Sequence, residues 1–144
     1  TKIRIPSKCK VIRSDFYSSS LTEDYRNLIK QMVTVEIPDT VTEIGDYAFY
    51  EWNNLEKVTI PESVTSIGAS AFSCCSSLTN ITIPESVTSI GQNAFHNCSS
   101  LTNITYKGTK GQWNKIDKSM TSGKVDWCDS TLKTITCTDG VITL

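Results

Sequence analysis

The residues of this chain best suited to nucleophilic or metal chemistry are one histidine, His96, and six cysteines. A cysteine activated by a neighbouring histidine is a common nucleophile, and His96 and Cys98 are the nearest such pair in the sequence. Two residues apart on a helical turn, however, the two side chains diverge. The sequence also lacks the Cys-x-x-Cys and paired-histidine spacings that hold zinc. We therefore expect no catalytic residue and no metal site.

Composition and charge narrow the classes of cofactor and partner. The chain has neither a Gly-x-x-x-x-Gly-Lys nor a Gly-x-Gly-x-x-Gly motif, so we expect no cofactor. Its 14 basic and 15 acidic residues give a net charge of -1 without long runs of either sign, unlike the basic footprint of nucleic-acid binders. No apolar run reaches the length that spans a membrane. The sequence opens without a methionine, which we interpret as a mature form or an excised piece of a longer protein.

The elements that position every side chain follow from an internal repeat of 23 residues. Segments 58–80 and 81–103 match at 18 of 23 positions, and segment 35–57 matches segment 58–80 at 10 of 23. A fixed period in this range is typical of a solenoid, in which each unit buries its apolar residues against its neighbours. The three copies read VEIPDTVTEIGDYAFYEWNNLEK, VTIPESVTSIGASAFSCCSSLTN and ITIPESVTSIGQNAFHNCSSLTN.

Each repeat contains a strand, an extended return and a turn. Val58 and Ile60 alternate with polar residues, which indicates a half-buried strand, and a proline then ends it. Ile67 is expected to lie in the interior on the return segment, and Gly68 directly after it predicts a turn with positive φ. Phe72 is expected to point inward from a short helical segment. Side chains thus fill the inside of the coil.

The cysteines have structural interpretations. Cys75 and Cys98 share a repeat position with Trp52, which indicates a core position where a free cysteine acts as a small hydrophobe. Strands of adjacent coils lie about 4.8 Å apart, within disulfide range, so a bridge between Cys75 and Cys98 is the alternative. Cys128 and Cys137, nine residues apart near the C-terminus, are favoured over that pair as a disulfide bridge.

Both ends of the chain depart from the period. Residues 1–34 read as a degenerate repeat with an inserted helix: Ile3 and Ile12 align with Val35 and Ile44 at an offset of 32, and a capping box spans 20–23. Residues 104–144 are expected to be a C-terminal cap. Trp113 and Trp127 could pack in that cap or form an exposed aromatic platform for a sugar ring.

The exposed side of the strands is the candidate ligand-binding surface. Stacking the repeats would align polar side chains in two rows, which could be a recognition face or simply a soluble, hydrogen-bonding surface. No arginine or aromatic residue, the usual anchor types in interfaces, interrupts these rows. The rows are Thr34, Lys57, Asn80 and Asn103, and Glu36, Thr59, Thr82 and Thr105.

The repeat pattern I-P-x-S-V-T-x-I-G-x-x-A-F-x-x-C-x-x-L resembles the BspA-like leucine-rich repeat of microbial surface proteins, and the resemblance covers 35–103. Segments 104–113 and 136–140 also look like the close of such arrays. The resemblance implies an α/β solenoid: a right-handed coil stack with a parallel sheet on the concave side, short helical turns on the other side and irregular caps.

Three functions remain open from the sequence. The resemblance favours a non-enzymatic adhesion module, secreted or on a cell surface, that binds a host or microbial surface protein. We expect the isolated chain to be monomeric. The second is a carbohydrate-binding accessory module of a larger extracellular enzyme, with Tyr50, Trp113 or Trp127 stacking on a glycan. The third is a scaffold segment that spaces or displays another domain.

Overall fold

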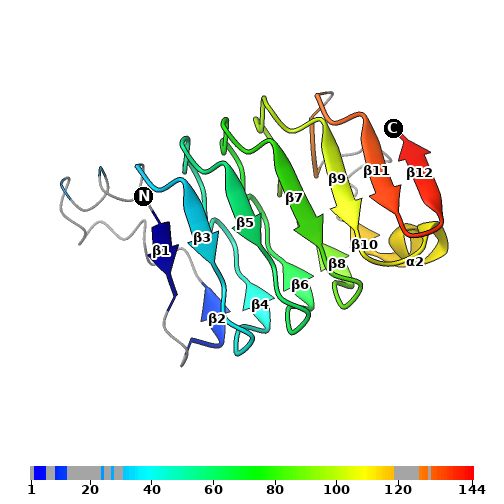
Figure 1. Cartoon of the computed structure of the whole chain (residues 1–144), viewed down its shortest axis with the longest axis horizontal. Coiled ribbons are helices and arrows are strands. Elements are labelled where there is room, and N and C mark those ends of the chain that lie inside the picture. The colour runs from blue at the N-terminus through cyan, green and yellow to red at the C-terminus, as the bar shows by residue number, and fades with distance from the viewer. Residues whose placement is uncertain are drawn as a thin grey trace.

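The computed structural model describes residues 2–5, 9–12, 24, 27, 31–118, 127–129 and 131–144. The chain coils so that successive passes add strands to two sheets, with the interior between them (Figure 1). One sheet has seven strands in the order β1-β3-β5-β7-β9-β11-β12, and the other has five in the order β10-β8-β6-β4-β2. The predicted repeat fold with a parallel sheet is confirmed, whereas the handedness of the coil stays a prediction.

The seven-stranded sheet is parallel except at its last strand. Neighbouring repeats pair at the offset of 23, so that Val58 lies beside Ile81, and Ile81 beside Ile104. The β11 and β12 strands form an antiparallel hairpin that ends the sheet. The strands are β1 (Lys2–Arg4), β3 (Thr34–Glu36), β5 (Lys57–Thr59), β7 (Asn80–Ile83), β9 (Asn103–Tyr106), β11 (Thr134–Cys137) and β12 (Gly140–Thr143).

The five-stranded sheet is built from the return segments, each contributing two residues. One residue of each of its first four strands along the chain is a buried isoleucine: Ile12, Ile44, Ile67 and Ile90. The strands are β2 (Val11–Ile12), β4 (Glu43–Ile44), β6 (Ser66–Ile67), β8 (Ser89–Ile90) and β10 (Asp117–Lys118). The extended return predicted from the repeat is thus a second parallel sheet.

A ladder of aromatic rings runs through the interior. Phe49 and Phe72 stack with centroids 5.1 Å apart, and Phe72 and Phe95 with centroids 5.4 Å apart. Trp127 closes the ladder with an edge-to-face contact to Phe95 at 6.3 Å. Such offset and edge contacts add to the energy of burying the rings. The repeated phenylalanine therefore forms the central column of the core.

The turns that carry these phenylalanines are not helical, contrary to the prediction. Instead, the backbone N–H of Phe49 donates to the carbonyl of Ala71, and that of Phe72 to Ala94, so neighbouring coils bond to each other. Because these N–H groups point to the next coil, they cannot serve the i to i−4 bonds of a helix. The one helix whose bounds the described residues give is α2 (Lys110–Lys115).

The predicted positive φ at the repeated glycine is also wrong. Positive φ occurs instead at non-glycine turn residues at the same offset of 23: Tyr47, Ser70 and Asn93, and Glu51, Cys74 and Asn97. Gly68 and Gly91 are needed for close approach: a Cβ on Gly91 would lie 2.5 Å from the backbone nitrogen of Ala69. Glycine is needed here because adjacent coils approach closely, and not because the chain turns with a positive φ.

The two irregular ends continue the sheets. Residues Lys2–Arg4 pair with Thr34–Glu36, and Val11–Ile12 with Glu43–Ile44, at the offset of 32 that the alignment predicts. The predicted capping box lies outside the described residues. At the other end, β10 and β11 add one strand to each sheet, and α2 lies between β9 and β10. In the described part, no helix is long and apolar enough to cross a membrane.

Candidate binding surface

The predicted polar rows are in register on the exposed face of the seven-stranded sheet. Strand pairing places Thr34, Lys57, Asn80 and Asn103 side by side in one row. The same pairing aligns Glu36, Thr59, Thr82 and Thr105 in the other. Both rows extend beyond the predicted set: Lys2 and Arg4 precede them on β1, and Thr134 and Thr136 follow on β11.

The centre of this face consists of side chains with unused hydrogen-bonding capacity. Lys57, Thr59 and Asn80 are exposed and Thr82 is half-buried. Within the part of the chain that the structure describes, none of these four side chains forms a hydrogen bond or ion pair. A hollow over β5 and β7 is lined by all four, together with Lys107 at its margin. An ammonium, two hydroxyls and an amide are therefore open to a ligand.

Towards the C-terminal end of the face, side chains form hydrogen bonds with one another. The hydroxyls of Thr134 and Thr136 both donate to Oδ1 of Asn103, at 2.8 and 2.9 Å. Asn103 and Thr105 are also half-buried. The side-chain amide oxygen of Asn103 is thus occupied. The C-terminal part of the face therefore offers fewer groups to a ligand than the centre does.

Towards the N-terminal end, Glu36 is held by two cations. Its carboxylate pairs with Lys2 and with Nε of Arg4, the latter at 3.2 Å. The hydrogen bond from Lys2, assisted by Arg4, lowers the pKa of Glu36 below its usual 4.5. These two cations lie outside the three regular 23-residue repeats. The offset of 32 identifies them, because it places Lys2 and Arg4 beside Thr34 and Glu36.

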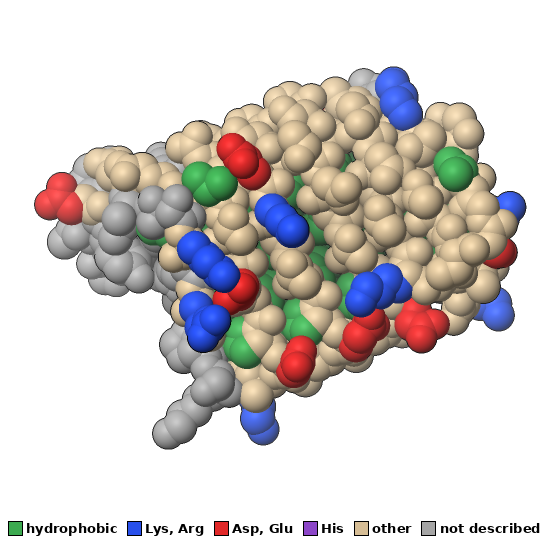
Figure 2. Space-filling view, in the orientation of Figure 1, with side chains coloured by type: hydrophobic (Ala, Val, Ile, Leu, Met, Phe, Trp, Pro, Cys, Tyr) green, Lys and Arg blue, Asp and Glu red, His purple; other side chains and the backbone are tan. Residues whose placement is uncertain are grey.

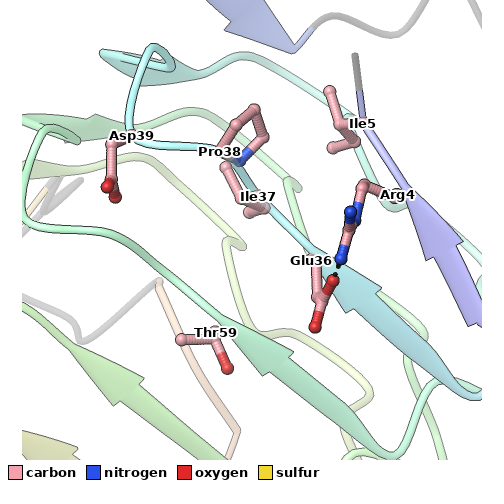
Figure 3. A pocket seen from close by; sticks show the side chains of 7 residues that line it. All are labelled: Arg4, Ile5, Glu36, Ile37, Pro38, Asp39 and Thr59. Carbon is pink, nitrogen blue, oxygen red and sulfur yellow. Dashed lines mark hydrogen bonds and ion pairs between the residues drawn. The ribbon is translucent and has the colours of Figure 1, made fainter. Parts of the chain in front are cut away.

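A second hollow lies beside this cluster, where β1 and β3 end (Figure 3). The half-buried Ile5 and Pro38 and the buried Ile37 give it apolar walls, and Arg4 and Glu36 lie at its edge. Figure 3 shows Asp39 and Thr59 on the opposite side, apart from the ion pair. The hollow is apolar, with charged groups only at its rim.

Charge is unevenly distributed over the face. In Figure 2, charged side chains gather over the N-terminal strands and along the lower margin, whereas the surface over β7, β9 and β11 is mainly neutral. Lys107 pairs with Glu62 at 2.6 Å, and both side chains are about half exposed. Lys57 is the cation near the centre of the face.

Two of the three aromatic candidates for sugar stacking are buried, so the exposed-platform interpretation is wrong for them. Trp113 and Trp127 are each 2% exposed. Their rings contact each other edge-to-face at 5.7 Å, and Trp113 also contacts Tyr106. The interior of the last coil is apolar and needs large rings to fill it, which is why both indoles are buried. Tyr50 is half-buried and lies outside the rows, in the turn between β4 and β5.

The cysteines and the histidine have separate structural roles. Cys75 and Cys98 are buried in the column of Trp52, as predicted, and their thiols donate to the carbonyls of Phe49 and Phe72, both at 3.1 Å. All six cysteines are free thiols. Burial raises the pKa of Cys98 to about 12 and that of Cys75 well above its usual value. These thiols are therefore protonated near neutral pH and poor nucleophiles.

His96 contacts a carboxylate of the last coil, that of Asp129, rather than a cysteine thiol. Its Nδ1 lies 2.6 Å from Oδ1 of Asp129, and the other carboxylate oxygen accepts from the backbone N–H of Asn97. In the preceding repeats, the N–H groups of Glu51 and Cys74 donate to a carbonyl of the next coil. Asp129 replaces that carbonyl, so this carboxylate completes the ladder where the regular repeats end.

Comparison with known proteins gives one match to a family. A model of the BspA type leucine rich repeat region, in 6 copies, matches residues 23–144. No curated protein matches the chain.

Three bacterial proteins of known structure share this fold. The T. pallidum leucine rich repeat protein TpLRR is 28% identical, with a TM-score of 0.61 over 72% of this chain and 44% of that one. A leucine rich cell surface protein from Faecalibacterium prausnitzii is 26% identical, with a TM-score of 0.54 over 83% and 35%. The pneumococcal vaccine antigen PcpA, at 19% identity, shares the fold with a TM-score of 0.69 over 96% and 30%. The chain spans less than half the length of each.

Proposed function

The chain belongs to the BspA-type leucine-rich repeat family, and from this premise we propose that it is a non-enzymatic protein-binding module of a secreted or surface-displayed microbial protein. Its ligand is a host or microbial surface protein, recognised on the exposed face of the seven-stranded sheet. The cell surface location is supported by the F. prausnitzii relative, which is described as a cell surface protein.

One observation carries the proposal: the centre of the face presents side chains that the fold itself does not use. Lys57, Thr59, Asn80 and Thr82 have no partner within the described chain, although they lie on the most regular strands. Inward residues of the same strands are fully engaged in the core. Because the paired strands already fix the backbone that carries these donors and acceptors, binding orders only their side chains and loses less conformational entropy than a loop would.

A glycan-binding module is the weaker candidate. Sugar recognition commonly uses an exposed aromatic ring as a stacking surface, and Trp113 and Trp127 are buried. The face that remains is one of hydroxyls, amides and a single central ammonium, which suits the mixed polar surface of a protein.

The test is a binding screen of the purified chain against immobilised host matrix proteins, mucin and microbial surface proteins, with a glycan array in parallel. Asn80→Arg places a bulky cation in the centre of the face and should reduce binding to any protein ligand at least about tenfold, a loss of about 1.4 kcal/mol. Gln92→Arg is the matched control, because Gln92 is exposed at the rim of the five-stranded sheet.

Three outcomes would reject the proposal. Binding to the glycan array alone would favour the carbohydrate-binding alternative. Equal loss of affinity in both variants, or in Gln92→Arg alone, would place the interface elsewhere. If no protein binds and deletion of this segment leaves the binding of a longer parent protein intact, the segment is a spacer. Thermal unfolding of both variants checks that the fold is unchanged.

A further inference from the structure

Within the described residues, β12 pairs with another strand on one side only. It is the last strand in the order of the seven-stranded sheet, and in Figure 1 its outer side faces away from the molecule. We propose that β12 is a self-association edge, through which two copies of the chain pair antiparallel into one continuous sheet. This inference concerns a different surface from the proposed ligand-binding face.

The hydrogen-bond pattern identifies the groups at this edge. The N–H of Leu144 donates to the carbonyl of Lys133 at 2.9 Å, which makes these residues a hydrogen-bonded pair of the hairpin. In antiparallel strands, bonded and non-bonded pairs alternate, so Val141 and Thr143 belong to non-bonded pairs with β11. Their N–H and C=O groups therefore point outward, where the described chain supplies no partner.

Most of this edge lacks the features that usually prevent pairing, although Nζ of Lys110 in α2 lies beside its first residue, 3.2 Å from where a Cβ on Gly140 would be. Exposed edges in soluble proteins are commonly protected by lysine, proline or a bulge, and β12 contains no charged residue or proline. Its side chains are unusually apolar: Val141 is 54% exposed and Leu144, directly after the strand, is 51% exposed. At the opposite end, Lys2 and Arg4 on β1 carry the charges expected of a protected edge.

A second copy fits this edge because the edge is complementary to itself. If Ile142 lies opposite its own symmetry mate, Val141 of each copy faces Thr143 of the other, and all four outward N–H groups find carbonyl acceptors. Ile142 is half-buried against the core, so the same register covers its remaining exposed surface with an identical side chain. The absence of charge on β12 means that no like charges meet in this pairing.

The pairing has a geometric consequence. Antiparallel strands in one sheet are related by a two-fold axis perpendicular to it, so the two seven-stranded sheets would expose their polar faces on the same side. A ligand with repeated binding sites could then contact both copies, which raises its apparent affinity without any new contact.

Sedimentation velocity of the purified chain tests the proposal. Two short edges bury less than the roughly 1,200 Å² of a standard interface, so the dimer is weak and concentrations up to about 1 mM are needed. The mean mass should rise from 15.9 kDa towards twice that value with concentration. Amide hydrogen exchange at Val141 and Thr143 should slow at least about threefold over the same range, as their N–H groups become bonded.

Variants separate this edge from other contacts. Thr143→Pro removes an outward N–H that the fold does not use and should keep the chain monomeric, since proline is tolerated at an open edge. Thr143→Val keeps the N–H and should dimerise like the natural chain. Val141→Lys, a second disrupting change that retains the backbone, should also abolish the dimer.

Four results would overturn the proposal: a natural chain that stays monomeric at every concentration, a dimer that survives both disrupting variants, unchanged exchange at Val141 and Thr143, or protection of these amides only by a different protein. Circular dichroism verifies folding of each variant.

Discussion

The same strands form the buried and the exposed side of the seven-stranded sheet, yet the two sides differ in how much their residues change from repeat to repeat. Inward positions carry nearly the same residue in successive coils, as in Val58, Ile81 and Ile104, all buried. Of the two outward rows, one changes from Lys57 to Asn80, whereas the other keeps a threonine at 59, 82 and 105. Each coil meets the same packed environment inside, where volume is restricted, while outside only polarity and strand compatibility are required. Specificity can therefore vary on the face without cost to the frame.

The largest effect should come from interrupting the aromatic ladder. Phe72→Ala removes the ring that stacks on both Phe49 and Phe95 and is itself fully buried. We expect the free energy of unfolding to fall by about 3–5 kcal/mol, measured by urea denaturation. Thr59→Ala, on the face of the adjoining strand, should change it by less than about 0.5 kcal/mol. Comparable losses in the two variants would contradict the division between frame and face.

A smaller loss should follow from filling the contact between coils. A Cβ at Gly91 would meet backbone atoms of Gly68 and Ala69 at 2.5–2.8 Å, so Gly91→Ala should cost about 1–3 kcal/mol. Gly111→Ala is the matched control, because its Cβ would have only Thr109 Oγ1 nearby, at 3.8 Å. Lying in α2, that change should stabilise the chain by up to about 1 kcal/mol. Thermal unfolding measures the stability of both variants. An unchanged stability of Gly91→Ala would contradict the close backbone contact between coils.

Much of this architecture could be predicted because the period and alternation directly report the packing of side chains. The turns could not. Positive φ at Tyr47 and Ser70 depends on bonds between coils, such as the Tyr47 N–H to the carbonyl of Ala69, and these are absent from any local pattern. The burial of Trp113 was likewise open, because the sequence there loses its period where α2 is inserted.

The candidate face shows the same limits. The two rows follow from repeat spacing, and strand pairing places their residues side by side. The repeat spacing does not predict which side chains of the rows stay free to bind a ligand. The side-chain oxygen of Asn103, for example, accepts hydrogen bonds from Thr134 and Thr136, which lie on a strand outside the repeats. Likewise, Glu36 is engaged by Lys2 and Arg4 across a 32-residue separation.

Thiol reactivity should separate adjacent residues of one turn. Cys74 is half-buried, whereas Cys75 is fully buried and its pKa is raised well above the usual value by burial. Because the thiolate is the reactive form, iodoacetamide should modify Cys74 in a Cys75→Ser chain more than about tenfold faster than Cys75 in a Cys74→Ser chain. In urea the two rates should converge. Equal rates in the folded protein would contradict the buried cysteine column.

The smallest expected effect is electrostatic and lies on the face. The pKa of Glu36 is lowered, first by the hydrogen bond from Lys2 and also by Arg4. A lowered folded-state pKa stabilises the fold above the usual 4.5, and this contribution is lost as pH falls through the lowered value. NMR titration should show the pKa of Glu36 returning towards 4.5 in Lys2→Ala. An unchanged pKa of Glu36 in that variant would contradict the ion pair between Glu36 and Lys2.

The most direct test of the central claim is an amide hydrogen-exchange footprint of the chain with a protein ligand from the binding screen. We expect new protection over β5 and β7, at Lys57, Thr59, Asn80 and Thr82, with little change along the five-stranded sheet. Protection confined to the five-stranded sheet or to the turn that carries Tyr50, with the β5 and β7 amides unchanged, would contradict it.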